Sequence, residues 1–109
     1  MVFQNWKNFG KMIVFKFSSY GDSMGTRLLG AKIRADLRPL LDKGETVVLD
    51  FSGIDTVTNS FADECIAKLL LEMSLDELKS KTTFTGLTPL AERSILTALK
   101  RRQMQVAKR

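Results

Sequence analysis

The chain has 109 residues and a formal net charge of +5, from 17 lysines and arginines against 12 aspartates and glutamates. Its length suits one domain with a single core, and 44% apolar with 27% charged residues is too apolar a composition for a disordered protein. No apolar run approaches the roughly 18 residues of a membrane-spanning helix, and residues 1–17 lack the apolar segment of a secretory signal. We therefore expect one cytoplasmic domain over residues 1–109 that binds no membrane.

The N-terminal part of the chain predicts one strand and one loop. Residues 1–10 fit three interpretations: an edge strand of the sheet, a short helix or a flexible extension. Residues 11–17 (KMIVFKF) are rich in β-branched and aromatic side chains and predict a first strand. Residues 18–25 (SSYGDSMG) are typical of a turn-rich connection that leads into a helix.

From Thr26 the apolar residues follow a helical period. One face of this predicted helix is apolar and carries Leu29, Ile33, Leu37, Leu40 and Leu41. A second face is basic, with Arg27, Arg34 and Arg38. Pro39 removes a backbone donor, so we expect a kink or a tightened last turn before Gly44 ends the element.

A second strand and a second helix follow. Residues 45–51 predict a strand, and the β-branched apolar run within it suits a strand that is covered on both faces. The next helix is expected from Ser60 to about Met73, with Ser60 as its N-cap and with Asp63 and Glu64 as negative charges in its first turn. Its predicted core face consists of Phe61, Cys65, Ile66, Leu69 and Leu70.

The C-terminal part predicts a short helical turn, a strand and a long helix. Residues 74–81 are polar and suit a helical turn at the surface, and residues 82–85 predict a third strand that ends before a glycine. Thr88 followed by Pro89 is typical of a helix start, with a capping hydroxyl before proline at the first helical position. This last helix is expected to continue to about Gln103.

The alternation of strands and helices predicts a small α/β domain, with a mixed or mostly parallel sheet of about four strands and helices packed on it. Ligands and partners of open α/β sheets bind beyond the carboxyl ends of strands. The polar turn after the second strand lies at such an end. We therefore expect a partner-binding surface formed by Ser52, Gly53, Asp55, Thr58, Asn59, Ser60, Asp63 and Glu64.

The residue types give little support to catalysis. The chain contains no histidine, which excludes Ser-His-Asp and Cys-His machinery and removes the commonest zinc ligand. Cys65 lies on the apolar helix face, so we expect a core side chain. A magnesium site would draw on Asp50, Asp55, Asp63 and Glu64, but turn hydrogen bonding, solvation and the helix terminus explain these carboxylates more simply. We expect no catalytic residue, no metal and no cofactor.

The motif Leu49-Asp50-Phe51-Ser52-Gly53, followed by Ser60-Phe61-Ala62-Asp63-Glu64, resembles the STAS-like domain family of uncharacterised function. That family is related to the STAS domains of anti-sigma factor antagonists. The similarity extends over residues 27–102. It implies helices on one side of a sheet of about four strands, and a non-enzymatic regulatory module that binds a protein partner.

The resemblance also implies the kind of partner, which is a histidine-kinase-like ATPase or an anti-sigma-type kinase that phosphorylates a serine at the start of the helix. Asn59 holds the position of that serine in this chain, and Ser60 and Thr58 are the neighbouring hydroxyls. A phosphate on Ser60 would face the positive end of the helix, yet Asp63 and Glu64 would repel it.

The alternative function is a nucleic-acid-associated module. It would use the basic helix face of Arg27, Arg34 and Arg38 together with the basic residues of the chain's end, where residues 104–109 are expected to form a basic tail. A basic last turn also suits the helix dipole by itself, so the solvated interpretation is favoured.

Overall fold

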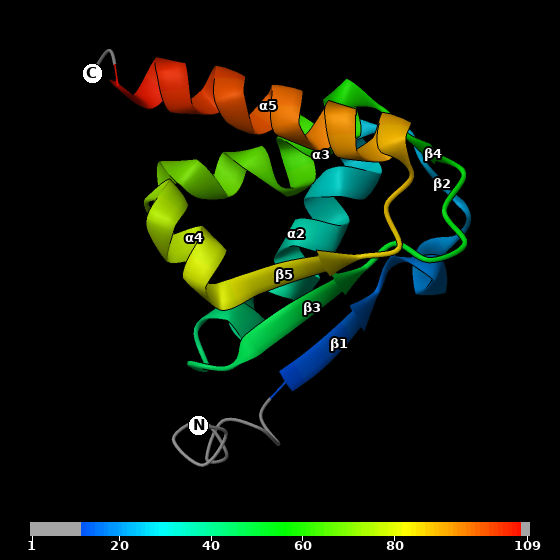
Figure 1. Cartoon of the computed structure of the whole chain (residues 1–109), viewed down its shortest axis with the longest axis horizontal. Coiled ribbons are helices and arrows are strands. Elements are labelled where there is room, and N and C mark those ends of the chain that lie inside the picture. The colour runs from blue at the N-terminus through cyan, green and yellow to red at the C-terminus, as the bar shows by residue number, and fades with distance from the viewer. Residues whose placement is uncertain (1–11, 108–109) are drawn as a thin grey trace.

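The computed structural model describes residues 12–107, so the interpretations of residues 1–10 lie outside the described part. The main sheet has three parallel strands in the order β1 (Met12–Lys16), β3 (Thr46–Asp50) and β5 (Thr82–Thr85). One side of this sheet carries the helices α2 (Arg27–Leu41), α3 (Asn59–Cys65), α4 (Leu75–Lys81) and α5 (Pro89–Ala107) (Figure 1). The predicted α/β class is confirmed.

Only one face of the main sheet is covered by the described residues. Val47 and Leu49 of β3 are buried, whereas Val48 between them is half-buried. On β1, Met12 and Val14 are 53% and 55% exposed. Coverage of the central strand on both faces is therefore a wrong prediction. The apolar run misleads because β-branched residues suit a pleated surface even where it is half-exposed.

A second, two-stranded parallel sheet lies beyond the main one. It pairs β2 (Ser23–Met24) with β4 (Thr56–Val57), and the Asp55 N–H donates to the Asp22 carbonyl at 2.9 Å beside it. Strands of two residues carry no periodic pattern, so the sequence indicates only polar connections at both segments. This small sheet ties the β3–α3 turn to the loop between β1 and α2.

Three packed phenylalanines join the ends of the elements under that turn. Phe17, the first residue of the 3-10 helix η2 (Phe17–Tyr20), stacks on Phe51 with ring centroids 4.0 Å apart. It also meets Phe61 edge-on at 6.4 Å. Each of the three rings is at most 1% exposed, so the ends of β1 and β3 and the start of α3 share one packed centre.

Local sequence signals fix two helix ends as predicted. The Thr88 hydroxyl accepts the Ala91 N–H at 3.1 Å, and Pro89 is the first residue of α5. The last turn of α2 is tightened, because the Asp42 N–H bonds to the Pro39 carbonyl at 3.3 Å in an i to i+3 pattern.

The predicted helix over residues 60–73 divides into two. α3 ends at Cys65, and a 3-10 helix, η3 (Ala67–Leu71), follows after Ile66. Cys65, Ile66 and Ala67 are each at most 1% exposed. Successive residues of a regular α-helix point about 100° apart, so burying three in a row favours a change of winding at this point.

The last helix is longer than predicted. α5 continues to Ala107, because residues 104–107 contain neither glycine nor proline to end it beyond Gln103. The first part of the predicted basic tail is therefore helical. Neither α5 nor any other helix between residues 12 and 107 combines the length and the apolar character needed to cross a membrane.

Gly30→Ala is expected to lower the free energy of unfolding by about 1 kcal/mol. A Cβ at Gly30 would lie 3.0 Å from the Cβ of Glu64 and 3.2 Å from the carbonyl oxygen of Phe61, so α3 must move away from α2. Overpacking of this kind costs roughly 1–3 kcal/mol, which exceeds the gain of about 0.8–1 kcal/mol in helix propensity.

Gly25→Ala is the control for this measurement by urea denaturation, since the nearest atoms there lie 3.9 Å away. Equal losses of stability in the two variants would contradict a close contact between α2 and α3 at Gly30.

Candidate functional site

The turn that follows β3 is stabilised by its own residues. The carboxylate of Asp50 accepts the Ser52 N–H at 2.9 Å, which confirms the predicted role of this aspartate. Hydrogen bonds from Ser52 hold the pKa of the Asp50 carboxyl below its usual range. Gly53 has a φ of +82°, and Ile54 is only 4% exposed. Ser52 and Gly53 are thus presented at the surface in a defined conformation.

Gly86, just after β5, packs directly on this turn. Its φ is +75°, and a Cβ placed on it would lie 2.5 Å from the Ser52 nitrogen and 2.8 Å from the Ser52 Cα. The Phe51 N–H donates to the Thr85 carbonyl at 2.9 Å beside it. The loop between β5 and α5 therefore supports the turn from a second side.

Thr58, and not Ser60, is the N-cap of α3. The Thr58 hydroxyl accepts the Phe61 N–H at 3.1 Å and donates to the Gly25 carbonyl, also at 3.1 Å. The predicted N-cap at Ser60 is therefore wrong, and Ser60 lies exposed in the first turn of α3. Two nearby hydroxyls give the same local signal, and the long-range contact to Gly25 distinguishes them.

Asp63 links three helices instead of serving the first turn of α3, where it was predicted. Its carboxylate accepts hydrogen bonds from Arg102 Nε at 2.7 Å, Arg102 Nη2 at 2.8 Å and Arg27 Nη1 at 2.8 Å. The bond from Arg102, and next the bond from Arg27, outweigh partial burial and lower the pKa of Asp63 to about 2. The side chain therefore joins α3 to both α2 and α5.

Glu64 is 7% exposed and forms the centre of a second cluster. Arg34 Nη1 and Lys68 Nζ each lie 3.0 Å from its carboxylate, and Arg27 Nη1 lies at 3.3 Å. Burial acts to raise the pKa of Glu64, but the hydrogen bonds from Arg34 and Lys68 prevail and the net shift is downward. Glu64 lies outside the first turn of α3, where it was predicted. Its largely buried carboxylate is engaged by cations of the fold, and its predicted contact with a partner stays a prediction.

The predicted basic face of α2 is matched by acids within the fold. Arg27 and Arg34 hold the two carboxylates of α3, and Arg38 donates to Glu72 at 2.8 Å and to Asp42 at 2.7 Å. Ion pairs of this kind reduce the positive potential that a phosphate backbone would meet. The face offers less to nucleic acid than the sequence alone indicates.

Asn59 and Ser60 are exposed beside a hollow of about 300 Å³ between α3 and α5. The other residues that line it are Arg27, Asp63, Ala98, Arg101, Arg102 and Gln105. Three arginines against one aspartate give this lining a net charge of +2. Arg101 forms no ion pair with any residue of the described range. From sequence, Arg101 and Arg102 belonged only to the basic end of the chain, and their approach to α3 was not predicted because it is a long-range contact without a local signal.

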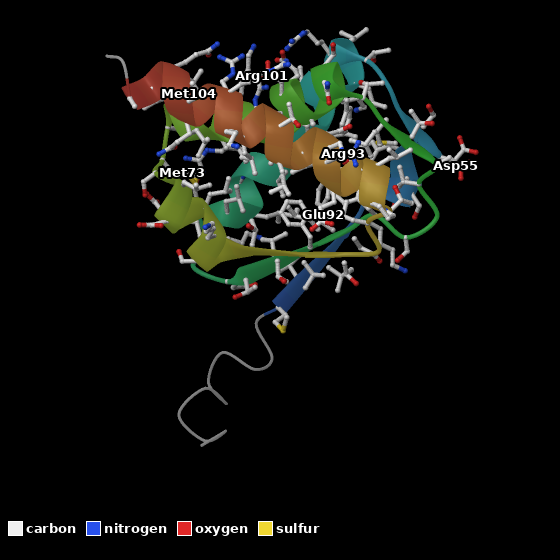
Figure 2. The ribbon with its side chains drawn as sticks, turned by 45° about the horizontal axis from the view of Figure 1, so that its top comes forward. Asp55, Met73, Glu92, Arg93, Arg101 and Met104 are labelled. Atoms are coloured by element: carbon white, nitrogen blue, oxygen red, sulfur yellow. The ribbon has the colours of Figure 1, made fainter. Side chains whose placement is uncertain are left out.

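A second hollow of about 380 Å³ adjoins the first on the other side of Asn59. Its lining includes Asp55 and Arg93, with parts of β4 and of the first half of α5. Figure 2 shows Asp55 at the outer end of the second sheet and Arg93 and Arg101 along α5. The structure thus gathers Asp55, Asn59 and Ser60 on one polar surface, whereas neither hollow includes Ser52 or Gly53.

The groups on this surface are suited to binding. They are amide, hydroxyl, carboxylate and guanidinium groups that donate and accept hydrogen bonds. Cys65 lies behind them at 0% exposure, and burial raises the pKa of its thiol to about 12, which leaves it unreactive. No three cysteine, aspartate or glutamate side chains within residues 12–107 converge in a way that would hold a metal ion.

Gly86→Ala is expected to destabilise the protein by about 1–3 kcal/mol more than Gly53→Ala does. Both glycines have a positive φ, so both variants incur the cost of roughly 1–2 kcal/mol for a left-handed residue. Only the Cβ at Gly86 would also collide with Ser52, since nothing lies within 4 Å of a Cβ at Gly53. Thermal and urea unfolding measure the difference, and equal effects would show that the β5–α5 loop does not support the turn.

Asp63→Asn is expected to lose less of its free energy of unfolding than the wild type does when the pH falls. A carboxyl whose pKa is lower in the folded state stabilises the fold above the unfolded pKa and loses this contribution as the pH falls through the folded value. For Asp63 the window lies between about pH 4 and about pH 2. The shift corresponds to at most about 2 kcal/mol, and solvent screening reduces this to about 1 kcal/mol.

Urea titrations at several pH values measure the slope. The control is Asp55→Asn, which removes an exposed carboxylate without an ion pair among the described residues and should retain the acid loss of the wild type. A slope unchanged in Asp63→Asn would contradict the linkage to Arg102.

A family model described as a STAS-like domain of unknown function matches residues 30–91, which is more than half of the chain. The match begins inside α2 and ends in the first turn of α5, so it includes β3, the turn, α3 and β5. No curated protein and no solved structure matches the chain. The chain belongs to the family of STAS-like domains of unknown function.

Proposed function

We propose that this protein is a non-enzymatic regulatory module that binds a protein partner through its turn surface, defined as Ser52, Gly53, Asp55, Asn59 and Ser60. Thr58, Asp63 and Glu64 act in support, because the first caps α3 and the two acids hold α3 against its neighbours. The observation that carries the proposal is an exposed polar segment on a rigid support, beside an arginine-lined hollow.

The support matters because a preorganised surface loses little conformational entropy when a partner binds. Ser52 is held by Asp50 and Gly86, Thr58 is held by Gly25, and both hydrogen bonds and packing restrict the backbone between them. The exposed amide of Asn59 and hydroxyl of Ser60 then offer directional hydrogen bonds to a partner.

The partner that suits a STAS-like module best is a histidine-kinase-like ATPase or an anti-sigma-type kinase, and Ser60 is the favoured phosphoacceptor. The Ser60 side chain is exposed, whereas the Thr58 hydroxyl is half-buried and engaged in the cap of α3. A phosphate on Ser60 would lie beside a lining with three arginines. Asp63 and Glu64 would repel it less than their sequence positions indicate, since both carboxylates are paired with cations.

Protein binding is favoured over nucleic-acid binding for an electrostatic reason. The arginines of the α2 face are paired with acids, and exposed aromatic side chains do not interleave with the basic residues of α5. On α5 the exposed cations of the described range are Arg93, Lys100 and Arg101, and only the last two are neighbours, so this helix gives a short basic patch at most.

Capture of a partner from native lysate tests the proposal. The tagged wild-type chain is expected to retain a protein that Asp55→Arg loses, because this substitution reverses the charge at the outer end of the turn surface. Glu45→Arg is the control, since it makes the same change just before β3, at the opposite end of that strand. Recovery of nucleic acid without a protein, or equal capture by both variants, would contradict the proposal.

Intact-mass measurement of the recovered chain tests the phosphoacceptor. We expect one added phosphate in the wild type and in Ser80→Ala, which removes an exposed hydroxyl on α4. Ser60→Ala should lack that phosphate. A phosphate that persists in Ser60→Ala would assign the modification elsewhere and remove Ser60 from the proposed role.

A further inference from the structure

A groove between α4 and α5 lies apart from the turn surface. It has a volume of about 500 Å³, and three leucines, one methionine and two lysines are among the residues that line it. The residues are Leu75, Lys79, Leu96, Thr97, Leu99, Lys100, Gln103 and Met104. Figure 2 shows Met104 near the carboxyl end of α5, on the same side of the molecule as α4.

The groove continues into a hollow of about 330 Å³ above β5. Both are lined by Leu75, Lys79, Leu96 and Leu99, so they form one depression. The floor of the hollow includes Leu49 and Ile66, which are each 1% exposed. The hollow therefore reaches down to the hydrophobic core.

The packing of α5 explains why this depression is apolar. Its buried positions are Ala91, Ile95 and Ala98, so two of the three side chains that the helix buries are small. Larger apolar side chains remain outside, with Leu96 at 58% and Met104 at 57% exposure. The segment from Leu96 to Met104 is about 12 Å long, which is about two turns of helix. Exposed apolar residues clustered beside a groove mark an interaction site.

The charges of the groove indicate what the partner carries. Lys79 and Lys100 line it, no acidic side chain does, and neither lysine forms an ion pair within the described part of the chain. This contrasts with the arginines of α2, which are matched by acids. A complementary partner brings carboxylates to the rim and apolar groups to the centre.

We propose that the α4–α5 groove binds an amphipathic helix of a partner protein, with its apolar face inward and with aspartate or glutamate residues beside Lys79 and Lys100. Anchors at i, i+3 or i+4 and i+7 match the two-turn length of the groove. One anchor enters the hollow above β5. A second copy of this chain fits less well, since an isologous contact would bring the same lysines together. A flat bilayer would not fill the hollow.

Selection from a display library of short helical peptides, with the full chain immobilised, tests this proposal. The selected peptides are expected to combine the apolar spacing with acidic residues, and fluorescence anisotropy then measures the affinity of one of them. Leu96→Asp should lower the affinity for that peptide by about tenfold or more, because the substitution places a charge in the groove. Leu28→Asp is the matched control, since Leu28 is an 85% exposed leucine on α2.

Charge reversal separates this proposal from general stickiness. The double variant Lys79→Glu with Lys100→Glu should bind the acidic peptide less tightly, and should prefer a version of the peptide with lysines in place of its acids. Asp55→Arg changes the turn surface and not the groove, so it should leave the affinity for the groove peptide unchanged. The two proposals can therefore fail separately.

Three outcomes would overturn the proposal. If the selected peptides lack acidic residues and bind Leu96→Asp as tightly as the wild type, the groove is not their binding site. Binding to vesicles of phosphatidylserine and phosphatidylcholine that Leu96→Asp abolishes, with no peptide selected, would assign the groove to a membrane surface. If the chain self-associates in sedimentation experiments and Leu96→Asp abolishes this self-association, the groove binds a second copy of the chain.

Discussion

The close contact between α2 and α3 is the constraint on which the rest of the structure depends. Gly30 lets the two helix backbones approach, since even a methyl group there would meet Glu64 and Phe61. At that distance the carboxylates of α3 lie within reach of the arginines of α2, and Arg102 closes the arrangement from α5. Packing and ion pairing support each other here, because the buried Glu64 would be costly without its partners.

That constraint also determines which groups remain for binding. Asp63 and Glu64 are held within the helix layer by ion pairs, and Arg27 and Arg34 of α2 are among their partners. The sequence presents these residues as two charged surfaces, one acidic and one basic. The fold joins them through ion pairs, and leaves amides, hydroxyls, the carboxylate of Asp55 and the guanidinium of Arg101 as the groups at or beside the turn.

Sequence patterns predicted the features that depend on neighbouring residues. The central strand, the hydrogen bond of Asp50 to the turn, and the helix start at Thr88 and Pro89 all follow from local chemistry. The N-cap of α3 was predicted two residues late, because the choice of Thr58 over Ser60 depends on a contact with Gly25, 33 residues earlier. The Asp63–Arg102 pair spans 39 residues and had no local signal. Errors thus concentrate where tertiary contacts select among equivalent local choices.

The helix α5 adjoins both proposed surfaces. On one side of the helix Arg102 binds Asp63, and on another side Leu96 and Lys100 line the groove. A ligand in the groove influences the turn surface only if it prefers a different position of α5. The alanines at the buried face bring α5 close to the layer beneath it, and the ion pair with Asp63 fixes its carboxyl half, so one position is strongly favoured. Independent binding at the two surfaces is the arrangement that this packing supports, and it would let one rigid module hold two partners at once.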